Sequence, residues 1–253
     1  MIYKVSEKFK SLQGEGLYAG TPMAFIRFVG CSVGKKVCVG CDTDFERVHS
    51  FRGGGEFTAE ELVAWAGDYE HICLTGGEPL DYDLTPLVVA GGEDFIYHIE
   101  TSGTRLPWEK AFPHEFFHQQ AQQRVRKALY ICVSPKPGYL EDAMLDYADE
   151  IKVIVPGLSN EIPSAQVDAR IRLIKGEGYH CAPGEFEAWA RGYRWPDLTD
   201  ALRWAQTGKL VFLQPRNGKF DIDPVNLRYV TDLLQTHPTL RLSVQMHKIL
   251  KVQ

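Results

Sequence analysis

A series of short apolar runs, each ending in glycine, proline or polar residues, constrains the fold of this chain more than any other feature. The runs are rich in valine and isoleucine and lack strict alternation, which is typical of strands covered on both faces, as in a parallel sheet. We therefore predict strands within residues 23–31, 71–79, 95–103, 129–137, 150–157, 209–215 and 240–248.

Helix-like stretches lie between these runs. Residues 58–67 open with Thr58 and carry Glu61 three positions later, which is a capping-box pattern. Residues 223–238 open with Asp223, a candidate N-cap, followed by Pro224 at the first helical position. Strands that alternate with helices predict an α/β fold with a parallel sheet or barrel.

The alternation blurs at 104–128 and at 158–208. The second segment holds three of the five tryptophans, and its end is typical of a helix closed by Gly208. Linkers lack so much aromatic area. We therefore interpret 158–208 as an insertion packed on the core before the last parallel strands, and the chain, 1–253, as one domain.

Composition narrows the class of protein. A chain of 253 residues with 44% hydrophobic residues can bury a full core. Its net charge of −5 argues weakly against a nucleic-acid partner, and no apolar run approaches the length of a membrane span or suggests a signal peptide. We expect a cytoplasmic protein that binds neither membrane nor nucleic acid, in which clustered cysteines indicate metal or redox chemistry.

Almost every run ends in polar residues that could bind a ligand or take part in catalysis. In parallel β/α proteins the functional loops leave the carboxyl ends of the strands, so we expect these groups to collect at one mouth. Only the run at 150–157 lacks such an end. The others end in Cys31, in Thr75-Gly76-Gly77-Glu78-Pro79, in Glu100-Thr101-Ser102-Gly103, in Ser134-Pro135-Lys136, in Gln214-Pro215-Arg216-Asn217, and in Gln245 with His247-Lys248.

Three cysteines, Cys31, Cys38 and Cys41, lie in one loop. A structural zinc ion needs four protein ligands, so a zinc site would require a distant fourth residue. A [4Fe–4S] cluster held by three thiolates instead leaves one iron open for a chelating group, such as the amino and carboxylate pair of S-adenosylmethionine. Gly76 and Gly77 would let the backbone approach such a ligand closely.

The three-cysteine loop followed by Gly-Gly-Glu-Pro resembles the radical S-adenosylmethionine superfamily. More narrowly, the chain resembles the 7-carboxy-7-deazaguanine synthase family in segments that run in order from residue 11 to 248, leaving only the insertion outside. The segments are SLQGEGLYAGTPMAFIRFVGC, CDTDF, CLTGGEP, ETSG, VSPK, LQP and QMHK.

This resemblance implies a partial, modified (β/α) barrel and a homodimer. It also implies a radical lyase of 7-deazapurine (queuosine-type) biosynthesis, which converts 6-carboxy-5,6,7,8-tetrahydropterin to 7-carboxy-7-deazaguanine with loss of ammonia. The cofactors would be a [4Fe–4S] cluster, S-adenosylmethionine and Mg²⁺. A glycyl-radical-enzyme activase and a zinc-stabilised binding module are the alternatives.

The resemblance also assigns residues. Cys31, Cys38 and Cys41 would hold the cluster, and the Thr43 hydroxyl would bind Mg²⁺, a hard ion that takes oxygen ligands. Residues that would bind S-adenosylmethionine are Gly40, Asp42, Gly77, Ser134, Pro135, Lys136, Gln214, Pro215, Arg216 and Asn217. Residues that would bind the pterin are Leu12, Gln13, Gly14, Glu15, Arg27, Thr75, His247 and the C-terminal Gln253.

Arg27 is the lone charge in an apolar strand, and a buried arginine usually has an anionic partner. That partner is either a protein carboxylate, such as Glu15, or the carboxylate of the substrate. The cysteine loop departs from the family pattern in its longer first gap, Ser32 to Val37, and in Gly40, where an aromatic residue is usual. Its two lysines, at 35 and 36, suggest either a raised reduction potential of the cluster or contact with an acidic electron donor of the flavodoxin type.

Overall fold

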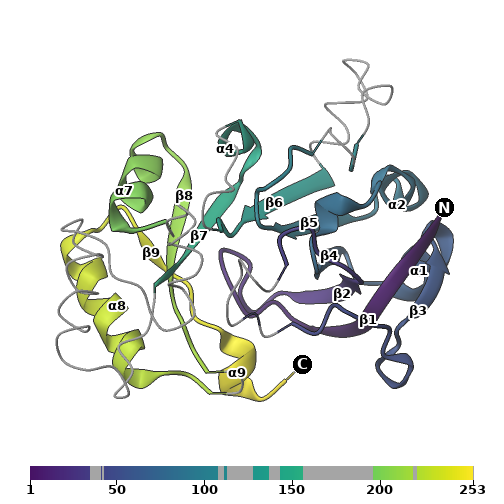
Figure 1. The fold of residues 1–253 in the computed structure, drawn as a ribbon, viewed down its shortest axis with the longest axis horizontal. Coiled ribbons are helices and arrows are strands. Elements are labelled where there is room, and N and C mark those ends of the chain that lie inside the picture. Colours follow the sequence, from purple (N-terminus) through teal and green to yellow (C-terminus); the bar gives the residue numbers. More distant parts are fainter. Residues whose placement is uncertain are drawn as a thin grey trace.

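The computed structural model describes residues 1–34, 41, 43–107, 111–112, 128–136, 143–155, 196–218 and 221–252. Within these ranges one sheet contains nine strands in the order β3-β1-β2-β4-β5-β6-β7-β8-β9. Helices lie along its outer face, and the chain returns at its end toward the loop between the first two strands (Figure 1). The chain therefore has the expected α/β class and the arrangement of an open, partial barrel.

The parallel part of the sheet confirms the predicted strands up to residue 215. Neighbouring strands from β2 to β9 pair in parallel, with Arg27 opposite Thr75 and Ile99 opposite Ile131, for example. The strands are β2 (Pro22–Phe28), β4 (His71–Gly76), β5 (Ile96–Thr101), β6 (Leu129–Val133), β7 (Glu150–Val155), β8 (Leu210–Pro215) and β9 (Arg241–Leu242).

Two features of the sheet differ from the prediction. First, β1 (Ile2–Leu12) pairs antiparallel with both β2 and β3 (Gly55–Thr58), whereas the apolar runs indicated parallel strands alone. Second, the run at 240–248 forms only the two-residue β9 and then the short helix α9 (Met246–Leu250). His247 consequently lies on a helix and not at the end of a strand.

The predicted caps are confirmed. In α1 (Ala59–Ala66) the Thr58 N–H donates to Glu61 Oε2 at 2.8 Å, and the Glu61 N–H donates to Thr58 Oγ1 at 3.2 Å. Asp223 caps α8 (Pro224–Thr236) by accepting from two backbone N–H groups. The remaining helices are α2 (Thr85–Gly91), α4 (Met144–Tyr147), α7 (Leu198–Gln206) and the 3₁₀ turns η1 (Ser50–Arg52) and η2 (Pro79–Asp81).

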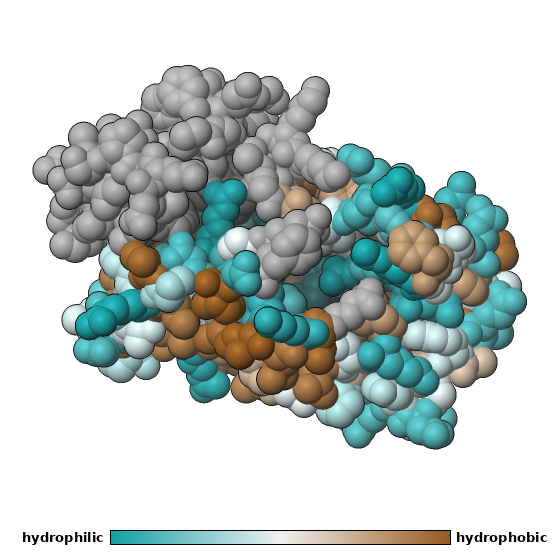
Figure 2. All heavy atoms as spheres, turned by 90° about the horizontal axis from the view of Figure 1, so that it is seen from below, coloured by the Kyte–Doolittle hydropathy of each residue, from teal (hydrophilic) through white to brown (hydrophobic). Residues whose placement is uncertain are grey.

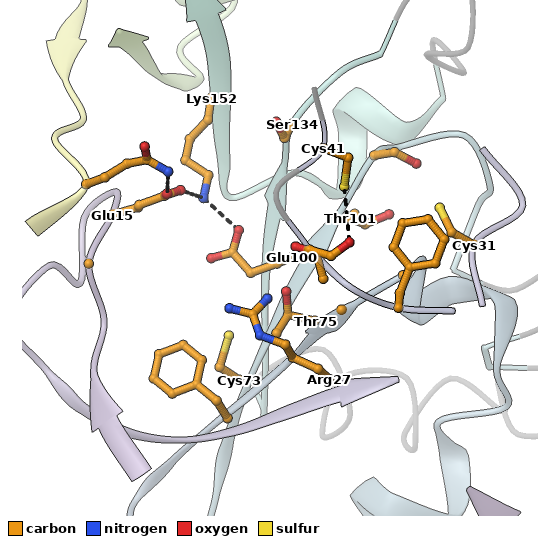
Figure 3. A pocket seen from close by; sticks show the side chains of 18 of the residues that line it. Glu15, Arg27, Cys31, Cys41, Cys73, Thr75, Glu100, Thr101, Ser134 and Lys152 are labelled. Carbon is orange, nitrogen blue, oxygen red and sulfur yellow. Dashed lines mark hydrogen bonds and ion pairs between the residues drawn. The ribbon is translucent and has the colours of Figure 1, made fainter. Parts of the chain in front are cut away.

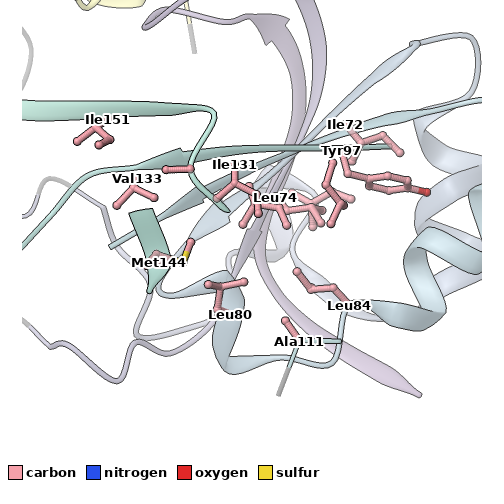
Figure 4. Close-up of a cluster of buried hydrophobic side chains, with 14 of the residues drawn as sticks. Ile72, Leu74, Leu80, Leu84, Tyr97, Ala111, Ile131, Val133, Met144 and Ile151 are labelled. Atoms are coloured by element: carbon pink, nitrogen blue, oxygen red, sulfur yellow. The ribbon is translucent and has the colours of Figure 1, made fainter. Parts of the chain in front are cut away.

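The hydrophobic core lies between the sheet and these helices. Alternate residues of β4 to β7 point into it, and residues from the helices and from η2 pack against them (Figure 4). Leu198, Ala201 and Trp204 place α7 in the same core. The rest of the insertion, up to residue 195, lies outside the described residues, so the single-domain assignment stays a prediction. The residues labelled in the core are Ile72, Leu74, Leu80, Leu84, Tyr97, Ala111, Ile131, Val133, Met144 and Ile151.

The β1–β2 loop spans the opening of the sheet and contacts its last strands. The Met246 N–H donates to the Gly14 carbonyl at 2.9 Å, and the Leu17 N–H donates to Glu150 Oε2 at 2.9 Å. Gly16 has φ of +69°, and a Cβ there would lie 2.1 Å from Glu150 Oε1, so the turn requires glycine. The loop thus covers the inner face of the sheet and encloses a cavity there.

None of the helices in the described residues is long and apolar enough to cross a membrane.

Candidate active site

A cavity of about 860 Å³ opens at the carboxyl ends of the parallel strands. Except for buried Pro135, every predicted site residue that the structure describes lines it, which confirms that the strand ends share one mouth. Cys38, Gly40, Asp42 and Gln253 lie outside the described residues. The predicted residues that line the cavity are Leu12, Gln13, Gly14, Glu15, Arg27, Cys31, Cys41, Thr43, Thr75, Gly77, Ser134, Lys136, Gln214, Pro215, Arg216, Asn217 and His247.

Cys31 and Cys41 lie on one side of this cavity, away from Glu15 (Figure 3). Cys41 Sγ is 3.9 Å from the Thr43 carbonyl oxygen, and burial raises the pKa of the Cys31 thiol. Two thiols facing one space suit a soft iron–sulfur group. No group of three or more metal-ligating side chains occurs among the described residues, which exclude Cys38.

The Gly76-Gly77-Glu78 turn packs directly against the start of the cysteine loop. The Glu78 N–H donates to the Gly30 carbonyl at 3.2 Å. A Cβ at Gly77 would lie only 1.5 Å from that carbonyl oxygen, and Gly76 has φ of +106°. Both glycines are therefore required for the close approach of two backbones beside Cys31.

The Glu78 carboxylate anchors this turn to the next strand. It accepts hydrogen bonds from Thr101 Oγ1 at 2.6 Å, from the Ser102 N–H at 2.9 Å, from the Ser102 hydroxyl, and from the Leu80 N–H at 3.1 Å. Burial raises the pKa of Glu78, although these donors favour the ionised form. Thr101 and Ser102 of the predicted Glu-Thr-Ser-Gly motif thus hold the Gly-Gly-Glu-Pro turn in place.

A network of charged and amide side chains fills the opposite side of the cavity. Lys152 Nζ lies 2.8 Å from Glu15 Oε2 and 2.7 Å from Glu100 Oε2. Gln245 Nε2 donates to Glu15 Oε1 at 2.8 Å, and Gln13 Nε2 donates to Glu100 Oε1 at 3.2 Å. The network joins the β1–β2 loop to β5, to β7 and to the start of α9 (Figure 3).

Arg27 extends from β2 into the cavity, on the same side as Thr75 (Figure 3). Its Nε lies 3.0 Å from Glu7 Oε1 without a well-aligned hydrogen bond, and its guanidinium carbon lies 5.5 Å from the centre of the Phe9 ring. Pairing with Glu15 was therefore the wrong alternative, since Glu15 pairs with Lys152. The guanidinium nonetheless borders the space in which a ligand would lie.

The later strands supply the remaining polar groups of the wall. Lys136 Nζ donates to Ser134 Oγ at 3.0 Å, and buried Gln214 accepts from Ser243 Oγ at 2.9 Å. His247 packs on Gly14, where a Cβ would lie 2.2 Å from His247 Nδ1. These contacts bring residues from both ends of the chain to one site.

Lys152, Glu100 and Gln245 line the cavity but were not among the site residues predicted from the sequence. Glu100 and Gln245 were recognised only as polar strand ends. Lys152 lies in the middle of the one run that ends without such a group. The signal that could have identified it is the one used for Arg27, a lone charge within an apolar strand.

Similar proteins of known function show the family of this chain. No family model matches the chain. A 7-carboxy-7-deazaguanine synthase of Escherichia coli K12 is 36% identical over 178 residues, which cover 60% of this chain and 71% of that protein. This chain belongs to the 7-carboxy-7-deazaguanine synthase family. A synthase of the same name from Bordetella pertussis is 29% identical over 272 residues and aligns along the full length of both chains.

The fold agrees with that membership. The crystal structure of QueE from Escherichia coli superposes with a TM-score of 0.62 and 26% sequence identity, covering 97% of this chain and 94% of that one. A 7-carboxy-7-deazaguanine synthase is a radical S-adenosylmethionine enzyme, so the membership favours the cluster-binding interpretation of the cysteines over a zinc module. The roles of individual side chains stay predictions.

Proposed function

We propose that this chain is a 7-carboxy-7-deazaguanine synthase that converts 6-carboxy-5,6,7,8-tetrahydropterin to 7-carboxy-7-deazaguanine with loss of ammonia. One observation carries the proposal: seventeen predicted side chains and glycines from the whole length of a family member line one cavity. A volume of about 860 Å³ lies in the range of small-molecule sites, and it suits a cofactor and a substrate side by side.

At the cysteine side we assign the cluster to Cys31, Cys38 and Cys41. S-adenosylmethionine would lie next to it, because Gly77 borders the cysteine loop on one side and the remaining residues line the adjoining wall. When bound, these groups supply a carbon-centred radical that abstracts hydrogen from the substrate. The adjoining residues are Ser134, Lys136, Gln214, Pro215, Arg216 and Asn217, and we assign Gly40, Asp42 and Pro135 to the same ligand.

At the opposite side we assign the pterin to Leu12, Gln13, Gly14 and Glu15, with Thr75, His247 and Gln253 completing the site. Arg27 would bind the substrate carboxylate. Its support is electrostatic: Arg27 faces the cavity, and Glu7 engages its Nε without a well-aligned hydrogen bond. A bidentate guanidinium–carboxylate pair would fix the substrate in one orientation.

Thr43 is our proposed Mg²⁺ ligand, together with waters and the substrate carboxylate. Its support is that Thr43 lines the cavity two residues after Cys41, and that Mg²⁺ prefers oxygen ligands and retains waters. Thr43→Ala should raise the Mg²⁺ concentration needed for half-maximal turnover, whereas Thr43→Ser should not. Equal Mg²⁺ requirements in both variants would refute the assignment.

We also propose a homodimer and a flavodoxin-type electron donor. Exposed large hydrophobic residues support the first, because such patches mark protein interfaces. Leu17 in the β1–β2 loop and Ile249, Leu250 and Val252 in and after α9 are exposed, and the face that α9 borders carries a broad hydrophobic surface (Figure 2). Light scattering at several protein concentrations would test the dimer, which a monomer at all of them would refute.

The test of the proposed function is anaerobic reconstitution followed by incubation with S-adenosylmethionine, dithionite, Mg²⁺ and the carboxytetrahydropterin. The expected product is 7-carboxy-7-deazaguanine, detected by mass. An intact cluster without this product would refute the function.

Arg27→Ala should abolish product formation and keep uncoupled cleavage of S-adenosylmethionine. Arg52→Ala is the matched control, because Arg52 lies 3.4 Å from the same Glu7 and does not line the cavity. Loss of the cluster in the Arg27 variant would show that its role is structural.

A further inference from the structure

Lys152 is the most deeply buried cation of the cavity wall, with 5% of its side chain exposed. It lies on β7, and its Nζ contacts one oxygen of Glu15 and one of Glu100, at 2.8 and 2.7 Å. The other oxygen of each carboxylate accepts from a glutamine, Gln245 for Glu15 and Gln13 for Glu100. Among the described residues, the ammonium therefore bridges two carboxylates whose other hydrogen-bond partners are neutral amides.

Two carboxylates in one buried space repel each other, and without compensation one of them retains a proton at neutral pH. The positive charge of Lys152 offsets this repulsion. Burial opposes ionisation of Glu15, but the charge and hydrogen bond of Lys152 lower its pKa to about 2. Burial likewise opposes the charge on Lys152, and the surrounding carboxylates nevertheless hold its pKa well above the ordinary value.

Other titratable groups face this pair from the packed elements. Glu150 of β7 and His247 of α9 act on the same charges. Cys73 of β4 and Cys132 of β6 are neutral neighbours, because burial raises their thiol pKa well above the ordinary value. Arg27 of β2 contributes positive charge near Cys73.

We propose that Lys152 is a positioning residue that holds Glu15 and Glu100 side by side as paired hydrogen-bond acceptors, and thereby selects a heterocycle edge rich in N–H donors. The inference rests on the proposed function, whose substrate carries such an edge in its 2-amino group and ring N–H groups. A protonated carboxyl would present a donor there and would favour a carbonyl-rich edge instead.

The charges also give the cavity a direction. Two carboxylates and one ammonium leave one net negative charge around Lys152, and Arg27 lies on the other side of Glu100 from Lys152 (Figure 3). A substrate with N–H donors at one end and a carboxylate at the other fits this field in only one orientation. Lys152 would contribute to that orientation without contact with the reacting carbon.

The test compares wild type, Lys152→Met and Lys152→Arg by equilibrium binding of 6-carboxytetrahydropterin between about pH 6 and pH 8.5. In wild type Glu15 is ionised throughout, so the dissociation constant changes only through titration of the substrate and of groups such as His247 that both proteins share. In Lys152→Met one carboxylate takes up a proton as the pH falls, and binding should weaken about tenfold more than in wild type over this range. Lys152→Arg keeps the charge and should restore the wild-type profile.

A second measurement serves if Lys152→Met does not fold. Infrared spectra of wild type with ¹³C-labelled glutamate, compared with Glu15→Gln and Glu100→Gln, report the ionisation of these two carboxylates directly. Glu15 should remain ionised from about pH 5 to pH 8. Protonation of Glu15 in this range would overturn the inference, as would a folded Lys152→Met with the wild-type pH profile.

The outcomes separate the inference from the proposed function. If wild type does not bind the carboxytetrahydropterin, the proposed function fails, and infrared spectra of wild type and of Lys152→Arg or a folded Lys152→Met still decide whether the charge of Lys152 keeps Glu15 ionised. If wild type binds it and Lys152→Met binds equally at every pH, the function stands and the positioning role fails. A deamino analogue should lose affinity for wild type and gain relative affinity for Lys152→Met; equal discrimination by both proteins would overturn the selectivity.

Discussion

The contact between Gly77 and Gly30 gives a stability prediction whose size follows from the backbone alone. A Cβ added at Gly77 would lie 1.5 Å from the Gly30 carbonyl oxygen and 2.4 Å from its carbon. Nonbonded heavy atoms rest at about 3.5 Å, so the two loops would have to separate by roughly 2 Å. The obstructing atoms belong to the backbone and cannot rotate away as a side chain does.

Gly77→Ala should therefore lower the free energy of unfolding by about 3 kcal/mol, the upper end of the usual cost of overpacking. Because Gly30 precedes Cys31, the separation should also reduce the iron and sulfide retained after reconstitution. The φ angle of Gly77 lies outside the left-handed region. The penalty is thus one of contact and not of backbone conformation.

Guanidinium denaturation of matched glycine variants measures this penalty. Gly218→Ala is the control, since a Cβ there would lie 3.6 Å from the Asp221 carbonyl oxygen, an ordinary contact, and should change stability by less than about 0.5 kcal/mol. Gly14→Ala should cost about 1 kcal/mol, because the clash at 2.2 Å is with the movable His247 ring. Equal stability and equal iron content in the Gly77 and Gly218 variants would refute the reasoning.

Two other predictions concern buried polar groups. Burial, aided by His71, lowers the pKa of His98 to about 3, so its ring is neutral in the folded chain and takes up a proton on unfolding below about pH 6.5. The free energy of unfolding therefore falls by about 1.4 kcal/mol for each pH unit below that value. His98→Gln should remove this pH dependence, measured by denaturation at several pH values. An unchanged pH dependence would contradict the prediction. Fully buried Asn226 donates through Nδ2 to the carbonyls of Val155 and Arg216 at 3.1 and 3.0 Å. Asn226→Ala should therefore lower the free energy of unfolding by about 3 kcal/mol in the same assay. A loss below about 0.5 kcal/mol would show that water replaces the amide.

The central part of the sheet was predictable because its strands are covered on both faces. Residues of β4 to β7 cannot alternate between core and solvent, so they form the continuous apolar runs seen in the sequence. The caps of α1 and α8 were predictable for a local reason: Thr58, Glu61 and Asp223 satisfy N–H groups within their own first turn. Signals of this kind do not depend on distant parts of the chain.

The edges of the sheet depend on distant contacts and were not predicted. In β1 buried Tyr3 and Val5 alternate with the exposed Lys4, and no continuous apolar run marks the strand. Its antiparallel direction arises from pairing with β2 and β3. At the other edge, the Met246 N–H donates to the Gly14 carbonyl, more than two hundred residues away, and the chain turns into α9 instead of continuing β9.

Residues at the rim of the site follow the ends of strands and can be predicted from that position. Residues in its interior lie within strands and cannot be predicted in this way. Ser134 and Asn217 come after strands and were found by position alone, whereas Lys152 lies within β7. Its neighbours Ile151 and Val153 are core residues, so Lys152 points to the opposite, inner face. A charge cannot face the helices, because their contact surface is apolar and offers no partner for it. A lone charge in a strand covered on both faces must therefore point into the cavity of a partial barrel, as Arg27 and Lys152 both do.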